Sequence, residues 1–571
     1  MGVDHTQPGK GFLKQAAIRR PTIWRGLAVL CAALLLLPFT AAHDVASETS
    51  TSRMASQTST DESGNRPNVL VIMTDDQRRF GTMGVLPKTR QWFGQRGVEF
   101  PNGVVTTASC CPSRASTFSG QYVHNHGVDQ LFNSENLDPT HTVQYTLKNA
   151  GYRTGIAGKM FNDVDLCSDP PFFDRFAVQR GGYFSTEFRV DEHTGMDGAC
   201  SPGDGHIMRP EYSTTFVEQK AVEFLRDFDQ SEDEDPWLLF VHPFAPHVTT
   251  LGEDRSAKNV PKAELRYEDA SVPPWTRSPA VDEADLGDKP PHVRDTDRRA
   301  HATADGEAPL EAPVASIRNG MLRTLMSVDD LVGRVRQTLD KLDEERNTLI
   351  FFFSDNGYMW AEHGLQEKLE PYAASARVPF YARWSRCGSD GKPAPDCPGL
   401  LPAGTKDPRL AANIDITPTI YEATGITPPY TVDGQSLFST SPRDRILLEQ
   451  SRNTRLDPNG GVPAPGPTAV TNYDWGVPYW AAFWSPGNYL YRENYYDPDM
   501  GAASCYDQDP DTGCEYYVDQ GEPDEYYDLA RDPYELDNLL NDGDPATPTR
   551  DVSQLSEDVQ AARTCQGVEC P

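Results

Sequence analysis

The sequence predicts an α/β fold, with a central, mostly parallel sheet flanked by helices and a smaller C-terminal α+β domain. Three short apolar runs, 68–73, 237–242 and 348–353, are rich in β-branched and aromatic residues, as buried strands are. Each run is followed directly by polar residues, in the segments TDDQ, PFAPH and SDNG. Because ligands bind beyond the carboxyl ends of the strands in an open parallel sheet, we expect these three strand ends to converge on one site.

The N-terminal region is expected to direct export. Arginines precede the apolar run 26–39 and small residues follow it, which is typical of a secretory signal peptide, predicted here over residues 1–42. The run is shorter than the ~20 residues of a membrane span, so secretion is favoured over a membrane anchor formed by an uncleaved signal. Residues 43–66 are rich in Ser and Thr and poor in apolar residues, which predicts a flexible linker.

The rest of the chain is predicted to form a large domain over residues 67–440 and a C-terminal subdomain over residues 441–571. Apolar residues at helical spacing predict a crossover helix over 316–342 that leads into the third strand. Residues 251–313 show no sustained period and predict a surface insertion. From residue 441 onward, short segments rich in Tyr, Asp, Pro and Gly predict antiparallel strands and a late helix.

The charge of the chain argues against two classes of partner. Lys and Arg number 52 against 84 Asp and Glu, which gives a formal net charge of −32. Nucleic-acid binding and stable association with an anionic membrane surface are therefore not expected. An anionic substrate would need a locally positive site.

The cysteine content suits an exported protein, since the chain has 11 cysteines. Eight of them fall in an order that allows four local disulfides. These pairs are Cys167 with Cys200, Cys387 with Cys397, Cys505 with Cys514, and Cys565 with Cys570. Sequence does not fix the connectivity, and a mixture of free and bridged thiols is the alternative.

Cys110 and Cys111 stand directly before Pro112 in the segment CCPSR. Pro112 suits the first position of a helix, so both cysteines are expected at a helix N-terminus, where negative charge is favoured. A vicinal disulfide is strained, and structural zinc sites space their cysteines by two or more residues, so both are disfavoured. One structural thiol and one reactive position remain.

The segment CCPSR fits the C-x-P-S-R signature of type I sulfatases, and CCPSRASTFSGQYVHNHGV resembles the N-acetylglucosamine-6-sulfatases and extracellular heparan sulfatases. Six further segments match in order: RPNVLVIMTDDQ, GYRTGIAGKMFND, FAPH, SDNGYMWAEHGLQEKLEPYAASARVP, NIDITPTI and EYYDLARDPYELDNL. The resemblance implies an alkaline-phosphatase-superfamily fold. It also implies that a formylglycine-generating enzyme converts Cys110 to formylglycine, whose hydrated aldehyde is the nucleophile, with Cys111 as a packed neighbour.

A metal site is expected from the chemistry and from the resemblance together. Sulfate esters carry negative charge that repels nucleophiles, so a cation assists their hydrolysis, and oxygen ligands suit calcium. Taken alone, a DD or DNG segment is most often a turn or a helix cap. The resemblance instead implies that Asp75, Asp76, Asp355 and Asn356, together with Cys110, bind one Ca²⁺.

The resemblance also implies catalytic roles for four basic residues. Arg114 lies one helical turn after Cys110 and would neutralise the hydrated aldehyde. Lys159 and Lys368 match the two sulfate-binding lysines of the family. His247 matches the histidine that protonates the leaving oxygen.

One position departs from the pattern of many sulfatases, which carry a histidine two residues after the first lysine, within GKWH. This chain has Phe161 there, followed by Asn162. The glucosamine-sulfatase-like subgroup shares this departure. The base that regenerates the aldehyde is therefore open, and His124 or His126 are the candidates.

The expected function is removal of sulfate from a sulfated carbohydrate, such as 6-O-sulfated N-acetylglucosamine in a glycosaminoglycan, or from an aryl sulfate. A phosphoester or phosphonate ester hydrolase of the same superfamily is the nearest alternative, because a metal, a nucleophile at a helix N-terminus and basic residues serve phosphate as well. A non-catalytic glycan-binding homologue is disfavoured because all the expected site residues are present.

Overall fold

The structure is a computed structural model. It describes residues 66–191, 207–208, 210–230, 235–249, 260–290, 293–294, 311–384, 403–441, 443–450, 479–495, 508–509, 513–514, 524–541 and 551–571. The predicted signal peptide lies outside the described residues, as do the linker up to residue 65 and Cys200, Cys387, Cys397 and Cys505. Residues 60–571 form one compact unit, which contains all the helices and strands described.

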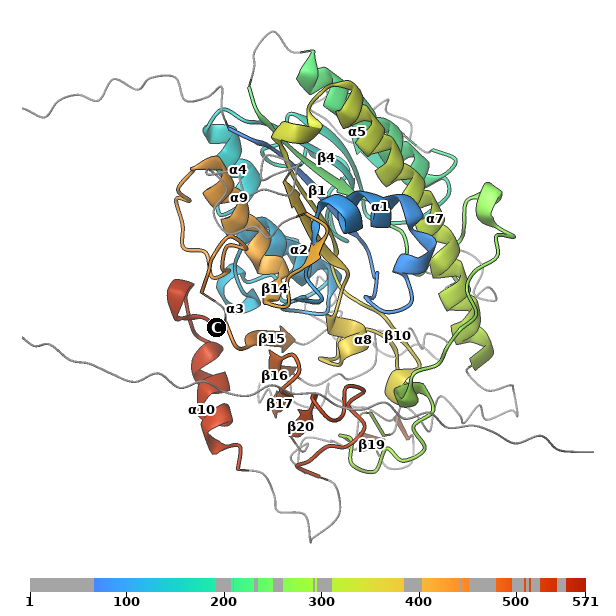
Figure 1. Ribbon diagram of the computed structural model, residues 1–571, viewed down its shortest axis with the longest axis vertical. Coiled ribbons are helices and arrows are strands. Elements are labelled where there is room, and N and C mark those ends of the chain that lie inside the picture. Colours follow the sequence, from blue (N-terminus) through green and yellow to red (C-terminus); the bar gives the residue numbers. More distant parts are fainter. Residues whose placement is uncertain are drawn as a thin grey trace, which may run out of the picture. The chain divides into compact units, whose positions relative to one another are not determined.

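The predicted α/β fold is confirmed by a mixed, mostly parallel sheet of ten strands (Figure 1). In spatial order the strands are β13 (Thr405–Lys406), β2 (Val98–Glu99), β12 (Phe380–Trp384), β9 (Thr348–Ser354), β1 (Asn68–Thr74), β8 (Trp237–His242), β4 (Arg153–Lys159), β5 (Arg175–Gln179), β6 (Phe188–Val190) and β7 (Ile207–Met208). The central strands β9, β1, β8, β4 and β5 are parallel to one another, whereas β12, β6 and β7 pair antiparallel to their neighbours.

The three apolar runs identified in the sequence are β1, β8 and β9, and β1 lies between the other two. The register aligns Val69 with Leu238 on one side and with Leu349 on the other. Every residue of the three strands is buried, as expected for a parallel sheet that is covered on both faces. Their carboxyl ends therefore reach the same edge of the sheet.

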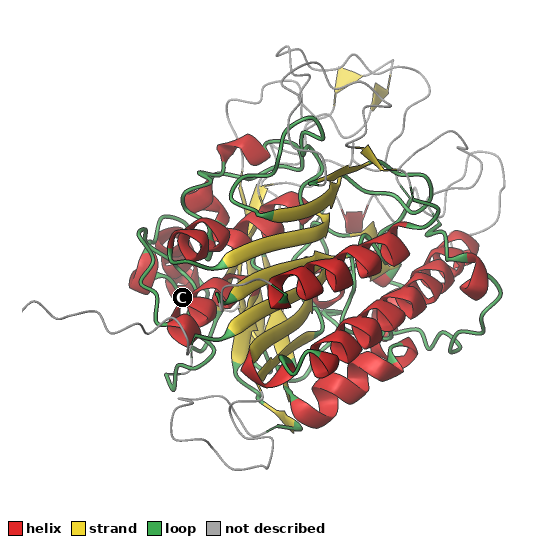
Figure 2. Cartoon of the chain, turned by 90° about the horizontal axis from the view of Figure 1, so that it is seen from above, coloured by secondary structure: helices red, strands yellow, loops and turns green. Residues whose placement is uncertain are grey.

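Helices cover both faces of this sheet, as Figure 2 shows from above. One face packs against α1 (Pro87–Arg96), α5 (Ser213–Asp229) and α7 (Glu311–Lys341). The other face packs against α2 (Cys110–Ser119), α4 (Val143–Asn149) and α9 (Ile416–Thr424). The crossover helix predicted over 316–342 is α7, which begins five residues earlier than its apolar period. No helix in the described ranges is both long enough and apolar enough to cross a bilayer.

The C-terminal region contains the expected antiparallel strands and late helix. Its sheet has the order β15 (Ile446–Gln450), β16 (Tyr479–Ser485), β17 (Tyr489–Tyr495) and β20 (Glu525–Asp528), and the helix is α10 (Ser553–Ala562). The smaller elements are α3 (Val123–His126), α8 (Ala373–Ala376) and the strand pairs β14 (Leu410–Ala412) with β3 (Asn102–Val104), β10 (Met359–Trp360) with β11 (Gln366–Glu367), and β18 (Gln508–Asp509) with β19 (Gly513–Cys514).

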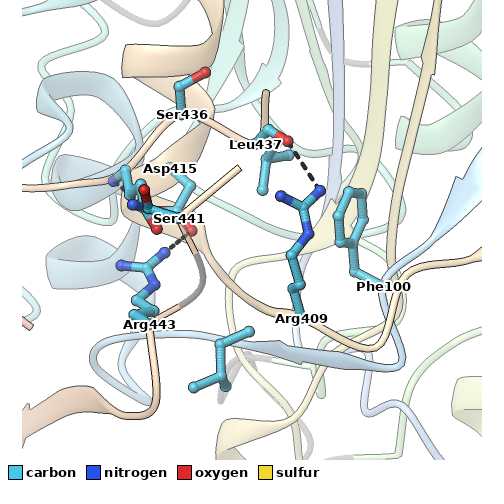
Figure 3. Close-up of a pocket in the computed structure, with 9 residues that line it drawn as sticks. Phe100, Arg409, Asp415, Ser436, Leu437, Ser441 and Arg443 are labelled. Carbon is cyan, nitrogen blue, oxygen red and sulfur yellow. Dashed lines mark hydrogen bonds and ion pairs between the residues drawn. The ribbon is translucent and has the colours of Figure 1, made fainter. Parts of the chain in front are cut away.

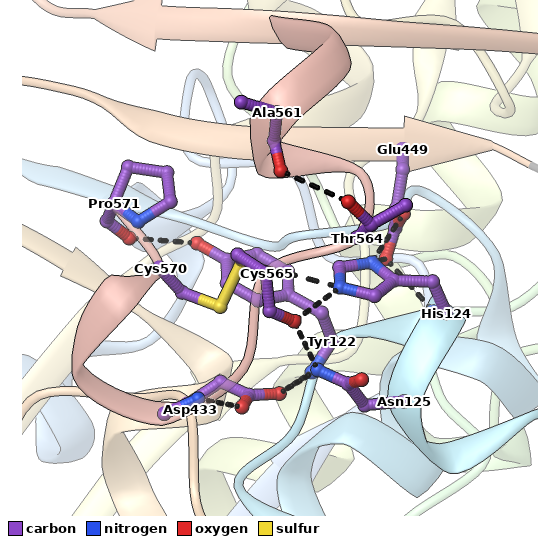
Figure 4. Close-up of a disulfide and its surroundings, with 11 residues drawn as sticks. Tyr122, His124, Asn125, Asp433, Glu449, Ala561, Thr564, Cys565, Cys570 and Pro571 are labelled. Carbon is purple, nitrogen blue, oxygen red and sulfur yellow. Dashed lines mark hydrogen bonds and ion pairs between the residues drawn. A yellow bond between two sulfur atoms is a disulfide. The ribbon is translucent and has the colours of Figure 1, made fainter. Parts of the chain in front are cut away.

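The chain end packs against α3 and contains a disulfide between Cys565 and Cys570, one of the four predicted pairs (Figure 4). The imidazole of His124 hydrogen-bonds with Glu449 through Nδ1 and with the carbonyl of Cys565 through Nε2. The hydroxyl of Tyr122 donates to the backbone oxygen of Pro571. These contacts fix the C-terminal segment to the loop that follows the helix α2.

Candidate active site

The tails of the three central strands are joined by hydrogen bonds, so the predicted convergence is confirmed. The backbone N–H of Asp75 donates to the carbonyl of Ala245 at 3.3 Å, which links the β1 tail to the β8 tail. The N–H of Asp355 donates to the carbonyl of Thr74 at 3.1 Å, and the N–H of Asp76 donates to Oδ1 of Asp355 at 3.1 Å. The tail of β9 is thereby fixed to that of β1.

The backbone after β1 turns so that two consecutive carboxylates face the same cluster. In an extended strand, Asp75 and Asp76 would point to opposite sides. Asp76 adopts a left-handed conformation with φ 68°, which Asp tolerates better than most residues. Both side chains are fully buried, and both lie near the sulfur of Cys110, at 3.5 Å for Asp75 Oδ1 and 4.0 Å for Asp76 Oδ1.

The helix α2 places the two cysteines in different surroundings. It begins at Cys110, so Pro112 is its third residue and the prediction of Pro112 at the first position is wrong by two residues. At this third position the missing N–H of Pro112 still costs no hydrogen bond, because the first four N–H groups of a helix have no intrahelical acceptor. Cys110 Sγ accepts a hydrogen bond from Lys368 Nζ at 2.9 Å and faces the carboxylates. Cys111 packs in the core, where its sulfur accepts the N–H of Asn162 at 3.1 Å.

The buried cluster around residue 110 contains a group of side chains that could hold a metal ion. Ligand atoms of Asp75, Asp76, Cys110 and His247 lie within 4.8 Å of one another. Asp76 Oδ2 and Asn356 Oδ1 are buried and accept no hydrogen bond from any described residue. A buried oxygen without a partner is costly, and a hard cation prefers carboxylate and amide oxygens, so these atoms suit such a cation.

Three buried cations face the carboxylates from the other side. Lys159 Nζ donates to Asp75 Oδ2 at 2.6 Å, and Lys368 Nζ forms an ion pair with Asp76. Arg114 donates from Nε to Asp355 at 2.8 Å and from Nη1 to the carbonyl of Lys159 at 2.6 Å. Arg114 therefore holds a carboxylate and the end of β4. Its Nη2 lies 3.5 Å from Asp75 Oδ2, so the guanidinium belongs to the same buried cluster as residue 110, and its expected role in neutralising the hydrated aldehyde stays a prediction.

The ionisation of the cluster reflects burial and crowding of like charges. Burial alone would raise the pKa of Asp75, but Lys159, His247 and Arg114 lower it below the usual 3.8. Burial and the neighbouring charge of Asp75 raise the pKa of Asp355 to about 7. Burial also raises the pKa of the Cys110 thiol well above 9.0, so an unmodified thiol would stay neutral.

His247 approaches the cluster from the β8 tail with a defined ring orientation. Its Nδ1 lies 2.6 Å from the carbonyl of Val248, so Nδ1 carries the proton and Nε2 faces Asp76 Oδ2 at 3.5 Å. The ring of Phe244 stacks on the imidazole with centroids 4.7 Å apart. Burial lowers the pKa of His247 below the usual 6.5.

The family model for the sulfatase domain matches residues 67–426. The chain belongs to the sulfatase family. It is 28% identical over 415 residues to a putative extracellular sulfatase homologue of Caenorhabditis elegans, covering 68% of this chain and 53% of that relative, so it spans about half the relative's length. It is 23% identical over 554 residues to an N-acetylglucosamine-6-O-sulfatase of Bacteroides thetaiotaomicron, with 87% of each chain covered.

Solved structures share the fold of this sulfatase domain. One, described as a complex with its substrate D-glucosamine-2-N,6-O-disulfate, superimposes with a TM-score of 0.57 at 20% identity and covers 87% of this chain and 97% of that one. The fold is therefore that of the sulfatases, with the central mostly parallel sheet and the C-terminal antiparallel sheet of the expected class.

The histidines considered as aldehyde-regenerating bases lie elsewhere in this sulfatase. His124 is held by Glu449 and by the C-terminal disulfide loop (Figure 4). His126 hydrogen-bonds with Ser116 Oγ at 2.9 Å, and burial lowers its pKa to about 3. The structure therefore does not support either residue in that role, because the loop after α2 turns toward the C-terminal segment.

Two residues that support the site were missed in the sequence. Gly158 has φ 117°, and a β-carbon there would lie 1.9 Å from the carbonyl oxygen of His242, so only glycine lets the last residue of β4 that pairs with β8 approach His242. His242 is fully buried, and its Nδ1 lies 3.3 Å from the carbonyl of Lys159, which Arg114 also contacts. The sequence signals that could have identified them are the position of Gly158 directly before Lys159 and the position of His242 at the end of an apolar run.

A small cavity beside Asp415, lined by none of the residues of the cluster around Cys110, is structural. It has a volume of about 10 Å³, room for one water molecule, and lies between Arg409 and Arg443 (Figure 3). Arg409 is paired with Asp407 and Arg443 with Asp415, so the positive charges of the lining are balanced. This cavity offers no site for a glycan.

Proposed function

We propose that this chain is a calcium-dependent sulfuric ester hydrolase that acts on sulfated carbohydrates, with 6-O-sulfated glucosamine as the preferred class. The observation that carries the proposal is the buried cluster around Cys110, in which three carboxylates and an amide oxygen meet two lysines, an arginine and a histidine. Membership of the sulfatase family and the similarity to an N-acetylglucosamine-6-O-sulfatase support the reaction and the substrate class.

The charge of the cluster suits binding of a sulfate ester. Asp75, Asp76 and Asp355 are matched by Lys159, Lys368 and Arg114, so the protein groups alone are close to neutral. Asp75, Asp76, Asp355, Asn356 and residue 110 would hold a calcium ion, which would supply Lewis acidity and two positive charges. The loaded site is then locally positive within a protein of net charge −32, which favours a sulfate monoanion.

Residue 110 provides the nucleophile after oxidation by a formylglycine-generating enzyme. One hydroxyl of the hydrated aldehyde attacks sulfur and displaces the alcohol, and loss of the proton from the second hydroxyl expels sulfate and restores the aldehyde. Lys159 and Lys368 orient the sulfate oxygens, and Arg114 holds Asp355 and the β4 end in place. Once its Nε2 has taken up a proton, the His247 imidazolium donates that proton to the leaving sugar oxygen.

Maturation would take place during export in this proposal. The predicted signal peptide, the Cys565–Cys570 disulfide and the similarity to an extracellular sulfatase homologue support secretion. We also propose the boundary between the catalytic domain, 67–440, and the C-terminal subdomain, 441–571, since β15 opens the antiparallel sheet at Ile446.

The test combines mass spectrometry with substrate profiling. The peptide that contains residue 110, from protein coexpressed with a formylglycine-generating enzyme, should carry an aldehyde, and the protein should release sulfate from N-acetylglucosamine 6-sulfate. The variant Cys110→Ala is the control and should bind calcium but release no sulfate. Faster turnover of an aryl phosphate than of the matched aryl sulfate would favour the phosphoester alternative. If the peptide is unmodified and the protein turns over neither ester, the remaining interpretation is a non-catalytic glycan-binding homologue.

A further inference from the structure

Tyr183 contacts the backbone of the proton-donating histidine from a different part of the sheet. It lies in the loop between β5 and β6, and its hydroxyl donates to the carbonyl oxygen of His247 at 2.6 Å. The side chain is buried, with 3% of its surface exposed. Burial and the neighbouring Tyr212 raise its pKa well above 10.0, so the hydroxyl keeps its proton and acts as a donor.

The ring of Tyr183 reaches the same histidine by a second route. It meets the ring of Phe244 edge to face, with centroids 5.1 Å apart, and Phe244 stacks on the imidazole of His247 at 4.7 Å. Edge-to-face and offset aromatic contacts have preferred geometries and so constrain ring orientation. The imidazole is therefore fixed by the Nδ1 contact to Val248, the stacked phenyl ring, and the hydrogen bond to its own carbonyl.

Tyr183 is itself held firmly, so it can transmit this constraint. Its backbone oxygen accepts the N–H of Ser213, the first residue of α5, at 2.7 Å. The opposite end of the histidine loop is fixed at Ala245, whose carbonyl accepts the N–H of Asp75. The loop after β8 is thus held at Ala245 by Asp75, a residue of the metal cluster, and at His247 by Tyr183.

We infer that Tyr183 is a positioning residue that keeps Nε2 of His247 directed at the leaving oxygen. This inference rests on the proposed function. A leaving alcohol of a sugar is a poor leaving group and needs a proton, whereas a nitrophenolate leaves without one. Loosening His247 should therefore slow sugar sulfates and spare activated aryl sulfates, and a general loss of stability would slow both.

The test compares Tyr183→Phe with Tyr152→Phe. Tyr152 is the matched control, because it is also 3% exposed and donates its hydroxyl to a backbone carbonyl, that of Pro67, at 2.9 Å. For Tyr183→Phe we expect kcat on N-acetylglucosamine 6-sulfate to fall roughly tenfold, the value of one ordinary hydrogen bond in the transition state. On 4-nitrophenyl sulfate kcat should change less than about twofold. Tyr152→Phe should leave kcat unchanged on both esters.

Equal loss on both esters, or no loss on the sugar sulfate, would overturn the role of Tyr183. If the wild type hydrolysed neither ester, the proposed function would fail, and nitrogen NMR of labelled histidine would then decide the positioning role separately. The NMR signals of His247 would be assigned by their absence from the spectrum of His247→Gln. A single Nδ1-protonated tautomer in the wild type that becomes mixed in Tyr183→Phe, but not in Tyr152→Phe, supports the inference, and an unchanged signal refutes it.

Discussion

His363 should make the stability of the protein fall as pH rises above neutrality. It lies in the loop that carries Asn356 at one end and Lys368 at the other, and it is fully buried. Its Nδ1 hydrogen-bonds to Glu283 at 2.7 Å, and its Nε2 forms an ion pair with Glu535 at 3.9 Å. The imidazolium therefore joins the site loop to two distant segments of the chain.

The magnitude follows from the shift in its pKa. Burial alone would lower the pKa of His363, but Glu283 and Glu535 raise it from 6.5 to about 9. The folded state then holds the proton more tightly than the unfolded state, so the contribution is complete below pH 6.5 and is lost as pH rises through 9. A shift of about 2.5 pH units corresponds to about 3 kcal/mol, at 1.36 kcal/mol per unit.

Urea unfolding at constant ionic strength between pH 6 and pH 10 measures this effect. Other buried groups also titrate in this window, so the expected difference lies between the two proteins: the wild type should lose about 3 kcal/mol more unfolding free energy from pH 6 to pH 10 than His363→Gln. His141→Gln is the control, because the side chain of His141 is 44% exposed and its contact with Asp138 is 3.8 Å long. It should keep the wild-type profile.

The reasoning would be refuted by a wild-type profile that is flat from pH 6 to pH 10. It would also be refuted if His363→Gln retained the full wild-type slope, since other groups would then be responsible. Lys289, which pairs with Glu283, keeps its charge through most of this window because burial is outweighed by the nearby carboxylates, which raise its pKa above 10.5.

Three further predictions concern the metal, the second cysteine and the chain end. Calcium at about 100 times its Kd should add about 2.7 kcal/mol to the unfolding free energy of the metal-free protein, measured by thermal shift, and Asp76→Asn should remove this response. Cys111→Ala should cost about 1–3 kcal/mol in urea unfolding but leave aldehyde formation at residue 110 intact by mass spectrometry. Replacing both Cys565 and Cys570 by serine should speed hydrogen exchange in α10 while sulfate release stays within about twofold, since the bridge closes a short loop remote from the cluster.

The central sheet was predictable because its strands carry continuous apolar runs. The residues of β1, β8 and β9 are buried on both faces. A short continuous apolar run of this kind is typical of a strand in a parallel sheet that is covered on both faces. The polar tails were informative for the same reason, since a parallel sheet brings its carboxyl ends to one edge. Asp75, Asp355 and His247 could therefore be grouped from the sequence alone.

Boundaries and supporting contacts were less predictable. Proline is tolerated anywhere in the first turn of a helix, so Pro112 could not mark the first residue of α2. The first turn of α7 lies before its apolar period begins, so the hydrophobic pattern did not predict that turn. Tyr183 and His247 are 64 residues apart and meet only because β5 and β8 both flank β4, which no local pattern records.

The departure at Phe161 explains why the orientation of one histidine matters so much here. Phe161 is buried, with its ring centroid 5.7 Å from that of Phe118, so the position is used for packing of α2 against the β4 end. His247 is the histidine that lies with Asp75, Asp76 and Cys110. Expulsion of sulfate needs only a proton acceptor, which solvent can provide, whereas departure of a sugar alcohol needs a donor at a fixed place. In the proposed mechanism, the contacts that fix His247 therefore control departure of the sugar alcohol, the step for which the cluster around Cys110 offers no other histidine among the described residues.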